Sequence, residues 1–263
     1  MPEPEPLPAV LVTGGATRIG AEIAKGFAAN GWHVVIHYRS SGMDAEALAA
    51  ALPSAETFCC DLADIAAATE MVEALAARLA DWRCLINSAS VFRYDDVTSL
   101  NPDTNREAMQ INARAPALMA KSFLENIKGA GTHCVINITD MKLENPNPDF
   151  FSYTMSKHAL AATNAMFAVH ARSAKWERAR VYGIAPGAIL ASHDQSEGET
   201  EVSHRLNLLK RKTQPQEIVE AALFLSTGVL RSGSTLFIDS GQHLLSQDRD
   251  VIYLARQKSA ACP

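Results

Sequence analysis

Short apolar runs alternate with longer amphipathic stretches along almost the whole chain. The runs have the length of strands and lie at Ala9–Thr13, His33–His37, Thr57–Cys60, Cys84–Asn87, His133–Thr139, Arg180–Ile184 and Thr235–Asp239. Alanine-rich stretches with helical spacing separate them, at Arg18–Asn30, Asp44–Leu52, Ile65–Leu79, Arg106–Ile127, Tyr153–Ala174 and Gln216–Leu225. Strands that are apolar throughout are typical of a parallel sheet covered on both faces. The pattern therefore predicts one α/β domain, a doubly wound sheet of about seven parallel strands with helices on both faces.

The same pattern separates this domain from three less regular segments. Residues 1–8 alternate proline with glutamate, which predicts a flexible, extended tail and no secretory signal. Residues 9–245 carry all the predicted strands and helices. Within them, residues 191–212 are polar and weakly patterned and follow a strand end, so we expect a substrate lid there. Residues 246–263 form a C-terminal extension, and we expect the chain after Gly241 to become ordered only against a neighbouring subunit.

Composition and charge exclude several classes of protein. Of the 263 residues, 48% are hydrophobic and 20% are charged, and no apolar run approaches the ~20 residues of a membrane helix. The net charge of −5 and the scattered basic residues argue against a nucleic-acid partner. The five cysteines show no Cys-x-x-Cys spacing, and no cluster has the spacing of metal ligands. We therefore expect a cytoplasmic protein with free thiols, no bound metal and no membrane partner.

A glycine-rich segment, Thr13-Gly-Gly-Ala-Thr-Arg-Ile-Gly20, follows the first strand and leads directly into a helix. Glycines let the backbone turn tightly and approach a pyrophosphate, which then lies at the N-terminus of the helix. This order of strand, turn and helix predicts a dinucleotide site with its pyrophosphate over Gly14–Ile19.

The end of the second strand indicates which dinucleotide to expect. His37-Tyr-Arg-Ser40 contains no Asp or Glu that could hold a ribose 2′-hydroxyl. Arg39 and Ser40 instead offer a guanidinium group and a hydroxyl, which suit a 2′-phosphate, and Arg18 can add a second positive charge. The sequence therefore favours NADPH over NADH.

Asp140, Tyr153 and Lys157 have the chemistry of a proton donor. Tyr153 and Lys157 are four positions apart in a predicted helix and share one of its faces. An ammonium group beside a phenol favours the phenolate and lowers the pKa of the phenol from about 10. Asp140 follows a predicted strand, at the edge where open α/β sheets build their sites, and its charge would raise the pKa of the phenol. We expect the three groups to titrate as a coupled unit.

Taken together, these motifs resemble the short-chain dehydrogenase/reductase family from about Ala9 to Leu245. The resemblance rests on the turn Thr13–Gly20, Asp61-Leu62 after the third strand, Asn87-Ser-Ala-Ser90 after the fourth, Asn112, Tyr153 with Lys157, and Pro186-Gly187. It implies a Rossmann-type fold, reductase activity with a small-molecule substrate, and a homotetramer built on the helices that carry Asn112 and Tyr153.

Two departures from the common family pattern resemble the pteridine reductase branch, with its dihydromonapterin and dihydrofolate reductase members. Arg18 stands where the family usually has glycine, and Asp140 where it usually has serine. The segments Ser88-Ala-Ser-Val-Phe92, His37–Ser40 and Gly241-Gln-His-Leu244 are also similar to this branch.

The resemblance implies a role for each matching residue. Cofactor contacts are expected from Gly14, Arg18, Ile19, His37, Tyr38, Arg39, Ser40, Asp61, Leu62, Asn87, Ala89, Ser90, Thr139, Tyr153, Lys157, Pro186, Gly187 and Ile189. Substrate contacts are expected from Arg18, Ser90, Phe92, Asp140 and Tyr153, with a pterin ring between Phe92 and the nicotinamide. The catalytic set is Asp140, Tyr153, Lys157 and Asn112, in which Lys157 holds the nicotinamide ribose and Asn112 anchors a water molecule.

The chemistry of Asp140 bears on which bond is reduced. A serine hydroxyl can donate a hydrogen bond to a carbonyl oxygen, whereas a carboxylate only accepts and would repel a forming alkoxide. Asp140 therefore suits a heterocycle with N–H groups, and the favoured function is reduction of a C=N bond in a pterin-like substrate. Two alternatives stay open: a carbonyl reductase acting on a 3-oxoacyl-type keto group, and a non-catalytic NADPH-binding protein.

Overall fold

Seven parallel strands form a single sheet in the computed structural model, which describes residues 6–128, 131–171, 176–192 and 195–260. The strands are β1 (Ala9–Val12), β2 (His33–Tyr38), β3 (Ala55–Cys59), β4 (Trp82–Asn87), β5 (His133–Ile138), β6 (Ala179–Pro186) and β7 (Thr235–Ile238). Their order in the sheet is β3-β2-β1-β4-β5-β6-β7. The predicted parallel sheet is thereby confirmed, and the direction of winding reverses between β1 and β4, where open α/β sheets form their ligand crevice.

Alternate residues of the central strands enter two separate hydrophobic cores. In β1, the Leu11 side chain packs with the helices of one face, whereas Val10 and Val12 pack with those of the other. Leu11 is paired in register with Val35 of β2, so neighbouring strands add to the same core. This burial on both sides explains why the central strand β1 is apolar at every position.

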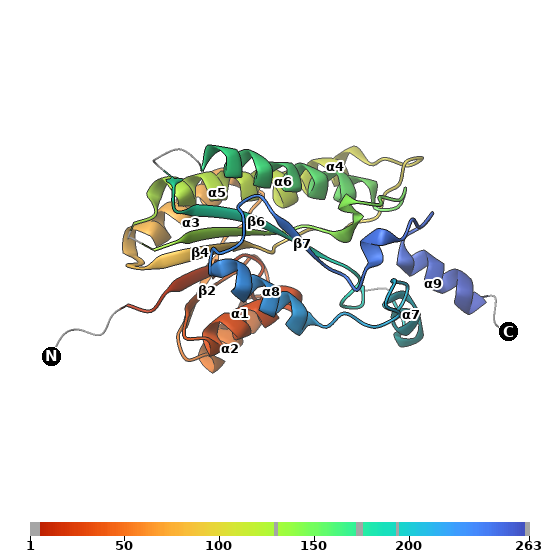
Figure 1. Ribbon diagram of the computed structural model, residues 1–263, viewed down its shortest axis with the longest axis horizontal. Coiled ribbons are helices and arrows are strands. Elements are labelled where there is room, and N and C mark those ends of the chain that lie inside the picture. Colours follow the sequence, from red (N-terminus) through yellow and green to blue (C-terminus); the bar gives the residue numbers. More distant parts are fainter. Residues whose placement is uncertain (1–5, 129–130, 172–175, 193–194, 261–263) are drawn as a thin grey trace.

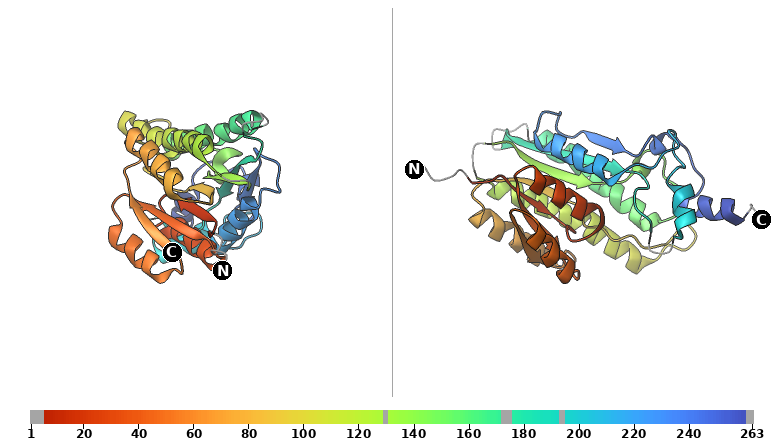
Figure 2. Two further views of the ribbon diagram at one scale, coloured as in Figure 1. Left: turned by 90° about the vertical axis from the view of Figure 1, so that its left-hand side faces the viewer. Right: turned by 90° about the horizontal axis from the view of Figure 1, so that it is seen from below.

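Helices cover both faces of the sheet (Figure 1, Figure 2). Figure 1 shows α3, α4, α5 and α6 above the sheet and α1, α2 and α8 below it. Their bounds are α1 (Arg18–Ala29), α2 (Gly42–Ala51), α3 (Ile65–Arg78), α4 (Pro102–Met109), α5 (Ala115–Asn126), α6 (Phe151–His170) and α8 (Pro215–Ser226). The sequence predicted these helical segments to within a few residues, except that Arg106–Ile127 was expected as one continuous helix.

A π-helical turn, η1 (Gln110–Arg114), separates α4 from α5. Pro116 has no amide hydrogen, so it cannot make the helical hydrogen bond to the carbonyl of Asn112. The amide of Ala115 instead donates to the carbonyl of Gln110, one residue further back than in an α-helix. The interruption therefore falls beside one of the predicted site residues.

The C-terminal part of the chain packs on its own subunit, contrary to the expectation that it would become ordered only against a neighbour. Helix α9 (Val251–Ala260) lies beside α7 (Glu197–Ser203) beyond one end of the sheet, at the right of Figure 1. Arg256 of α9 donates to the Glu199 carboxylate of α7 at 3.1 Å. Some predicted segments lie partly outside the described residues: 1–5 of the tail, 172–174 of the helix expected at Tyr153–Ala174, 193–194 of the lid and 261–263 of the extension.

Within the described part of the chain, no helix has both the length and the hydropathy that crossing a lipid bilayer requires.

Candidate active site

A cleft of about 500 Å³ opens at the carboxyl ends of the strands. Most of the residues predicted for the site line it: Gly14, Arg18, Ile19, His37, Tyr38, Arg39, Ser40, Asp61, Leu62, Ala89, Ser90, Phe92, Thr139, Asp140, Tyr153, Lys157, Pro186, Gly187 and Ile189. Two predicted residues, Asn87 and Asn112, do not. The tertiary structure thus brings together segments that are far apart in the sequence.

The glycine-rich turn is held from beneath by His37. The amide of Gly14 donates to Nδ1 of His37 at 3.1 Å, and Nε2 of His37 is 3.0 Å from the carbonyl oxygen of Cys60. This arrangement requires the neutral tautomer with its proton on Nε2. Burial lowers the pKa of His37 to about 4, which agrees with a neutral ring. His37 therefore connects the first turn to the second and third strands, a role that the sequence did not reveal.

Gly14 has a left-handed backbone, with φ of +62°, and lies against the segment that follows β4. A Cβ atom at this position would come within 2.9 Å of the Cα atom of Ala89. Glycine is therefore required here by both the conformation and the space.

Arg18 also has a left-handed backbone, with φ of +54°, although it carries a full side chain. Such a conformation costs an L-residue about 1–2 kcal/mol relative to glycine. Its guanidinium group donates to the carbonyl oxygen of Ala191 at 3.0 Å. The side chain thus links the glycine-rich turn to the first residue of the predicted lid.

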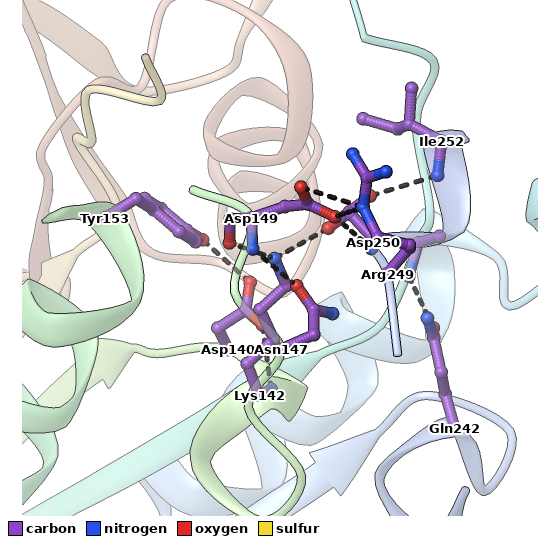
Figure 3. Close-up of polar contacts among 10 residues, drawn as sticks. Asp140, Lys142, Asn147, Asp149, Tyr153, Gln242, Arg249, Asp250 and Ile252 are labelled. Carbon is purple, nitrogen blue, oxygen red and sulfur yellow. Dashed lines mark hydrogen bonds and ion pairs between the residues drawn. The ribbon is translucent and has the colours of Figure 1, made fainter. Parts of the chain in front are cut away.

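Asp140 and Tyr153 form a direct hydrogen bond in the cleft, in which the phenol Oη donates to Oδ2 of the carboxylate at 2.8 Å (Figure 3). Asp140 begins the short 3-10 turn η2 (Met141–Leu143), and its Oδ1 accepts from the amide of Lys142 at 2.9 Å. The carboxylate is thereby fixed toward the phenol by its own turn.

The ionisation of this pair differs from the sequence-based prediction of an acidified phenol. Burial raises the pKa of Tyr153 well above its usual value of 10.0, and the adjacent Asp140 carboxylate acts in the same direction. Burial also raises the pKa of Asp140, against the opposing charges of Lys142 and Lys157. In the protein alone, loss of solvent and the charge of Asp140 therefore both act against the lowered phenol pKa that the sequence predicted.

Lys157 lies one helical turn after Tyr153 in α6. Its Nζ donates to the carbonyl oxygen of Ile138 at 2.8 Å and lies 5.5 Å from the centroid of the Tyr153 ring. Burial lowers the pKa of Lys157 to about 8, with the charge of Asp140 opposing this shift. The ammonium group is therefore held between the end of β5 and the phenol.

Asn112 and Asn87 support the cleft from behind. The Asn112 side chain exchanges two hydrogen bonds with the backbone of Val91, accepting at 2.8 Å and donating at 2.9 Å, and donates to Oγ of Ser156 at 3.0 Å. The Asn87 amide donates to Oδ1 of Asn137 at 2.8 Å. This amide faces the neighbouring strand, and the cofactor contact expected of Asn87 stays a prediction.

Phe92 forms an aromatic wall with two other rings. It stacks on Phe150 with 4.1 Å between the ring centroids and meets Tyr153 edge-on at 4.7 Å. Its side chain is 43% exposed, so one part of the ring remains accessible from the cleft.

The structure adds cleft residues that the sequence analysis missed. Lys142 and Gln242 line the cleft, as do Asp250, Val251 and Ile252 at the start of the C-terminal helix. Lys142 could have been noticed, since it is two residues after Asp140. Nothing in the local sequence distinguishes the buried Asp250 from carboxylates that lie on the surface.

The comparisons with known proteins agree with this architecture. A family model described as enoyl-(acyl carrier protein) reductase matches residues 14–243, which is most of the chain. The chain belongs to the short-chain dehydrogenase/reductase family. It is therefore an oxidoreductase of this family, and the resemblance seen in the sequence is confirmed.

Three relatives from this family illustrate the range of similarity. The crystal structure of FolM alternative dihydrofolate reductase 1 from Brucella suis, in complex with NADP, is 29% identical and superimposes with a TM-score of 0.84, covering 91% of this chain and 96% of that one. Pteridine reductase 1 of Leishmania tarentolae is 26% identical over 90% of this chain and 96% of its own length. A granaticin polyketide synthase ketoacyl reductase from Streptomyces violaceoruber is 27% identical over 90% of this chain and 97% of its own.

Proposed function

We propose that this protein is an NADPH-dependent reductase of a C=N bond in a pterin-like heterocycle. The hydrogen bond of 2.8 Å from Tyr153 to Asp140 is the observation that carries the proposal. It couples a proton donor to a carboxylate at the cleft wall, where the short-chain dehydrogenase/reductase family usually has a serine hydroxyl. The pteridine reductase and the FolM protein among the relatives support this assignment.

The residues of the cleft fit a phosphorylated dinucleotide. Gly14 leaves no side chain between the turn and Ala89, so a pyrophosphate can approach the backbone at the start of α1. The side chains of Arg39 and Ser40 are exposed at the end of β2, where the ribose of such a dinucleotide would lie. Among the described residues, Nε2 of the buried Gln242 side chain has no hydrogen-bond partner, which fits a polar ligand in the cleft.

The bound NADPH would supply the hydride, and the side chains of this chain would supply the proton. Reduction of a C=N bond places the hydride on carbon and one proton on nitrogen. Tyr153 holds a proton on Oη at neutral pH, because its pKa is raised, and it can release this proton to a ring nitrogen. Asp140, whose Oδ2 accepts from the phenol, would orient an N–H group of the substrate. The phenolate would regain its proton from solvent through the water relay, and Lys157 would hold the nicotinamide ribose beside the phenol.

Phe92 and Asn112 complete the proposed arrangement. The accessible part of the Phe92 ring would stack on the heterocycle and keep the accepting carbon near the nicotinamide. Asn112 would contribute its backbone carbonyl, to which Pro116 has no amide hydrogen to donate, to anchor a water molecule of the proton relay. Residues 191–212 would act as a substrate lid, since Ser192, Ser203 and His204 face the cleft and Arg18 reaches the carbonyl of Ala191.

The decisive test is a substrate panel with NADPH and purified protein. We expect turnover of dihydropterin or a related pterin at least about tenfold more efficiently than of acetoacetyl thioester. Preference for the thioester would instead support a carbonyl reductase, which the granaticin ketoacyl reductase relative favours. NADPH binding without turnover of any pterin, folate or ketone would support the non-catalytic alternative.

We also propose assembly as a homotetramer through the faces of the helices that carry Asn112 and Tyr153. On α6, the side chains of Met155, Met166 and Val169 are apolar and exposed in the single chain. An exposed apolar face of this kind is typical of a subunit interface. Size-exclusion chromatography with light scattering should give a mass of about four chains, and a monomer mass would contradict this proposal.

A further inference from the structure

A buried network of charges joins the C-terminal segment to the turn that carries Asp140 (Figure 3). Nζ of Lys142 lies 2.6 Å from Oδ2 of Asp250, and both side chains are nearly inaccessible, at 4% and 7% exposure. The Asp149 carboxylate accepts from Nε of Arg249 and from the amide of Asp250, each at 2.8 Å. The backbone of Asp250 and the side chain of Arg249 are thereby both anchored to Asp149.

Lys142 and Asp250 belong to the wall of the cleft beside the Asp140–Tyr153 pair. The amide of Lys142 donates to Oδ1 of Asp140 at 2.9 Å, so the backbone of the lysine helps to fix the position of the carboxylate. The amide of Ile252 donates to Oδ1 of Asp250 at 3.0 Å, and the Ile252 side chain packs with Phe150 and Tyr153. The C-terminal segment therefore acts on both members of the pair. Asp250 acts on Asp140 through the charge of Lys142, and Ile252 packs against Tyr153.

A buried ammonium group requires a counter-ion, because an uncompensated charge in the protein interior is unfavourable. Asp250 is the carboxylate that meets Nζ of Lys142 at ion-pair distance. The charges of Lys142 and Asp250 act on the neighbouring pair in opposite directions. Burial raises the pKa of Asp140, and the positive charge of Lys142 lowers it. Burial also raises the pKa of Tyr153, and the negative charge of Asp250 raises it further. The charges of Lys142 and Asp250 thus influence the pKa values of Asp140 and Tyr153 in opposite directions.

We propose that Asp250 is a positioning residue that, by holding Lys142 in an ion pair, fixes the pH range in which the Asp140–Tyr153 pair can deliver its proton. Asp250 does not reach the reacting atoms and acts through Lys142. This inference deepens the proposed reductase function and rests on it for its kinetic test. It also assigns a role to the C-terminal segment, which the family motifs do not include.

Other charged and titratable groups surround this network and stay constant in the test. They are Lys157 and Tyr153 from α6, Asp149 from the loop before α6, Arg249 and Tyr253 from the C-terminal segment, and His204 from the segment after α7. Because these groups are the same in each variant, a change in the pH profile reports on the exchanged charge.

The experiment compares the pH profile of kcat, with dihydropterin and NADPH, for D250N, K142M and the double variant. Loss of a negative charge favours deprotonation of both Asp140 and Tyr153, so D250N should move the profile to lower pH by about one unit. Loss of the positive charge should move the K142M profile to higher pH by a similar amount. The double variant, with no net change of charge, should return toward the wild-type profile. A merely structural ion pair would not give shifts of opposite sign.

The matched control is D248N, which removes the same charge from an exposed side chain two residues earlier. Its profile should coincide with that of the wild type. Coincident profiles for D250N, K142M and the wild type would overturn the proposal, as would shifts of D250N and K142M in the same direction. If D250N does not fold, the K142M profile decides: a shift to higher pH supports the proposal and an unchanged profile overturns it.

A second readout separates this proposal from the proposed function. The titration of Asp140 can be followed without substrate by carbon NMR of aspartate labelled at Cγ, with the signal assigned through its loss in D140N. In D250N its midpoint should fall, and in K142M it should rise. If the wild type reduces no pterin but these midpoints shift, the substrate assignment fails and the positioning role stands. If pterins are reduced and the midpoints do not move, the positioning role alone is wrong.

Discussion

His37 fixes the glycine-rich turn by accepting, at Nδ1, the amide proton of Gly14 at 3.1 Å. The imidazole can accept this hydrogen bond only while Nδ1 is unprotonated. Burial lowers the pKa of His37 from 6.5 to about 4, so the folded protein keeps the ring neutral throughout the physiological range. A residue expected to touch the cofactor therefore also holds the backbone on which the cofactor would lie.

The first prediction concerns the pH dependence of stability. As the pH falls below 6.5, the unfolded chain takes up a proton at His37, whereas the folded protein resists this until about pH 4. The stabilisation present above pH 6.5 is therefore lost as the pH falls toward 4, by up to about 3 kcal/mol. The H37N variant, whose amide oxygen can still accept from Gly14, should lose less free energy of unfolding across this range. Urea unfolding at several pH values measures the difference, and equal losses would contradict the assignment.

Gly14→Ala should prevent tight cofactor binding. The added Cβ would meet Ala89 at 2.9 Å in a backbone with positive φ, so the turn must distort. We expect the Kd for NADPH, measured by fluorescence titration, to rise by at least about tenfold. Gly31→Ala is the matched control: its φ is +80°, its Cβ would meet nothing within 4 Å, and it lies away from the cleft. That variant should lose about 1 kcal/mol of stability and bind NADPH normally; equal weakening in both would exclude the specific role of Gly14.

Arg39→Gln should weaken NADPH more than NADH. A charged hydrogen bond to a phosphate contributes about 1.5–3 kcal/mol, which corresponds to a tenfold to hundredfold increase in the Kd of NADPH. The Kd of NADH, which lacks the 2′-phosphate, should change little. Arg231 is exposed and does not line the cleft, so Arg231→Gln removes the same charge elsewhere. A parallel loss for both nucleotides in the Arg39 variant would show that the guanidinium contacts another part of the cofactor.

Tyr153→Phe should abolish most of the reductase activity while leaving cofactor binding intact. The substitution removes the proton on Oη that lies 2.8 Å from Asp140, and general acid catalysis contributes about 10²–10⁴-fold to a rate. We expect kcat to fall within that range. In the control Tyr94→Phe, the hydroxyl lost is the one that donates to Asp96 outside the cleft, and turnover should persist. Undiminished turnover by the Tyr153 variant would require another proton donor.

Asp140→Ser should move the substrate preference from C=N toward C=O bonds. The serine hydroxyl can donate to a carbonyl oxygen, and the carboxylate that accepts from Tyr153 is lost. The kcat/KM ratio of dihydropterin to a small ketone should fall by at least about tenfold in steady-state assays with NADPH. Asp140→Asn, which keeps the size but removes the charge, separates the charge from the shape of the side chain. An unchanged ratio in both variants would mean that Asp140 does not select the substrate.

The amino-acid sequence by itself determined the sheet and the cofactor end of the cleft. Continuous apolar runs such as Val34–Ile36 require burial on both faces, and a glycine-rich turn between a strand and a helix has few other uses. These features are local, because they depend on consecutive residues and their backbone conformations. The spacing of Tyr153 and Lys157 in one helix is local in the same sense.

Only the tertiary structure decided the ionisation of Asp140 and Tyr153 and brought Lys142 and Asp250 together in the wall of the cleft. Asp140 and Tyr153 have raised pKa values because folding removes them from water, an effect that the identities of their neighbours in sequence do not contain. Lys142 meets Asp250 because two turns separated by more than a hundred residues converge at the end of the sheet. Burial and long-range pairing of charges arise from packing in three dimensions, so the order of residues along the sequence does not predict them.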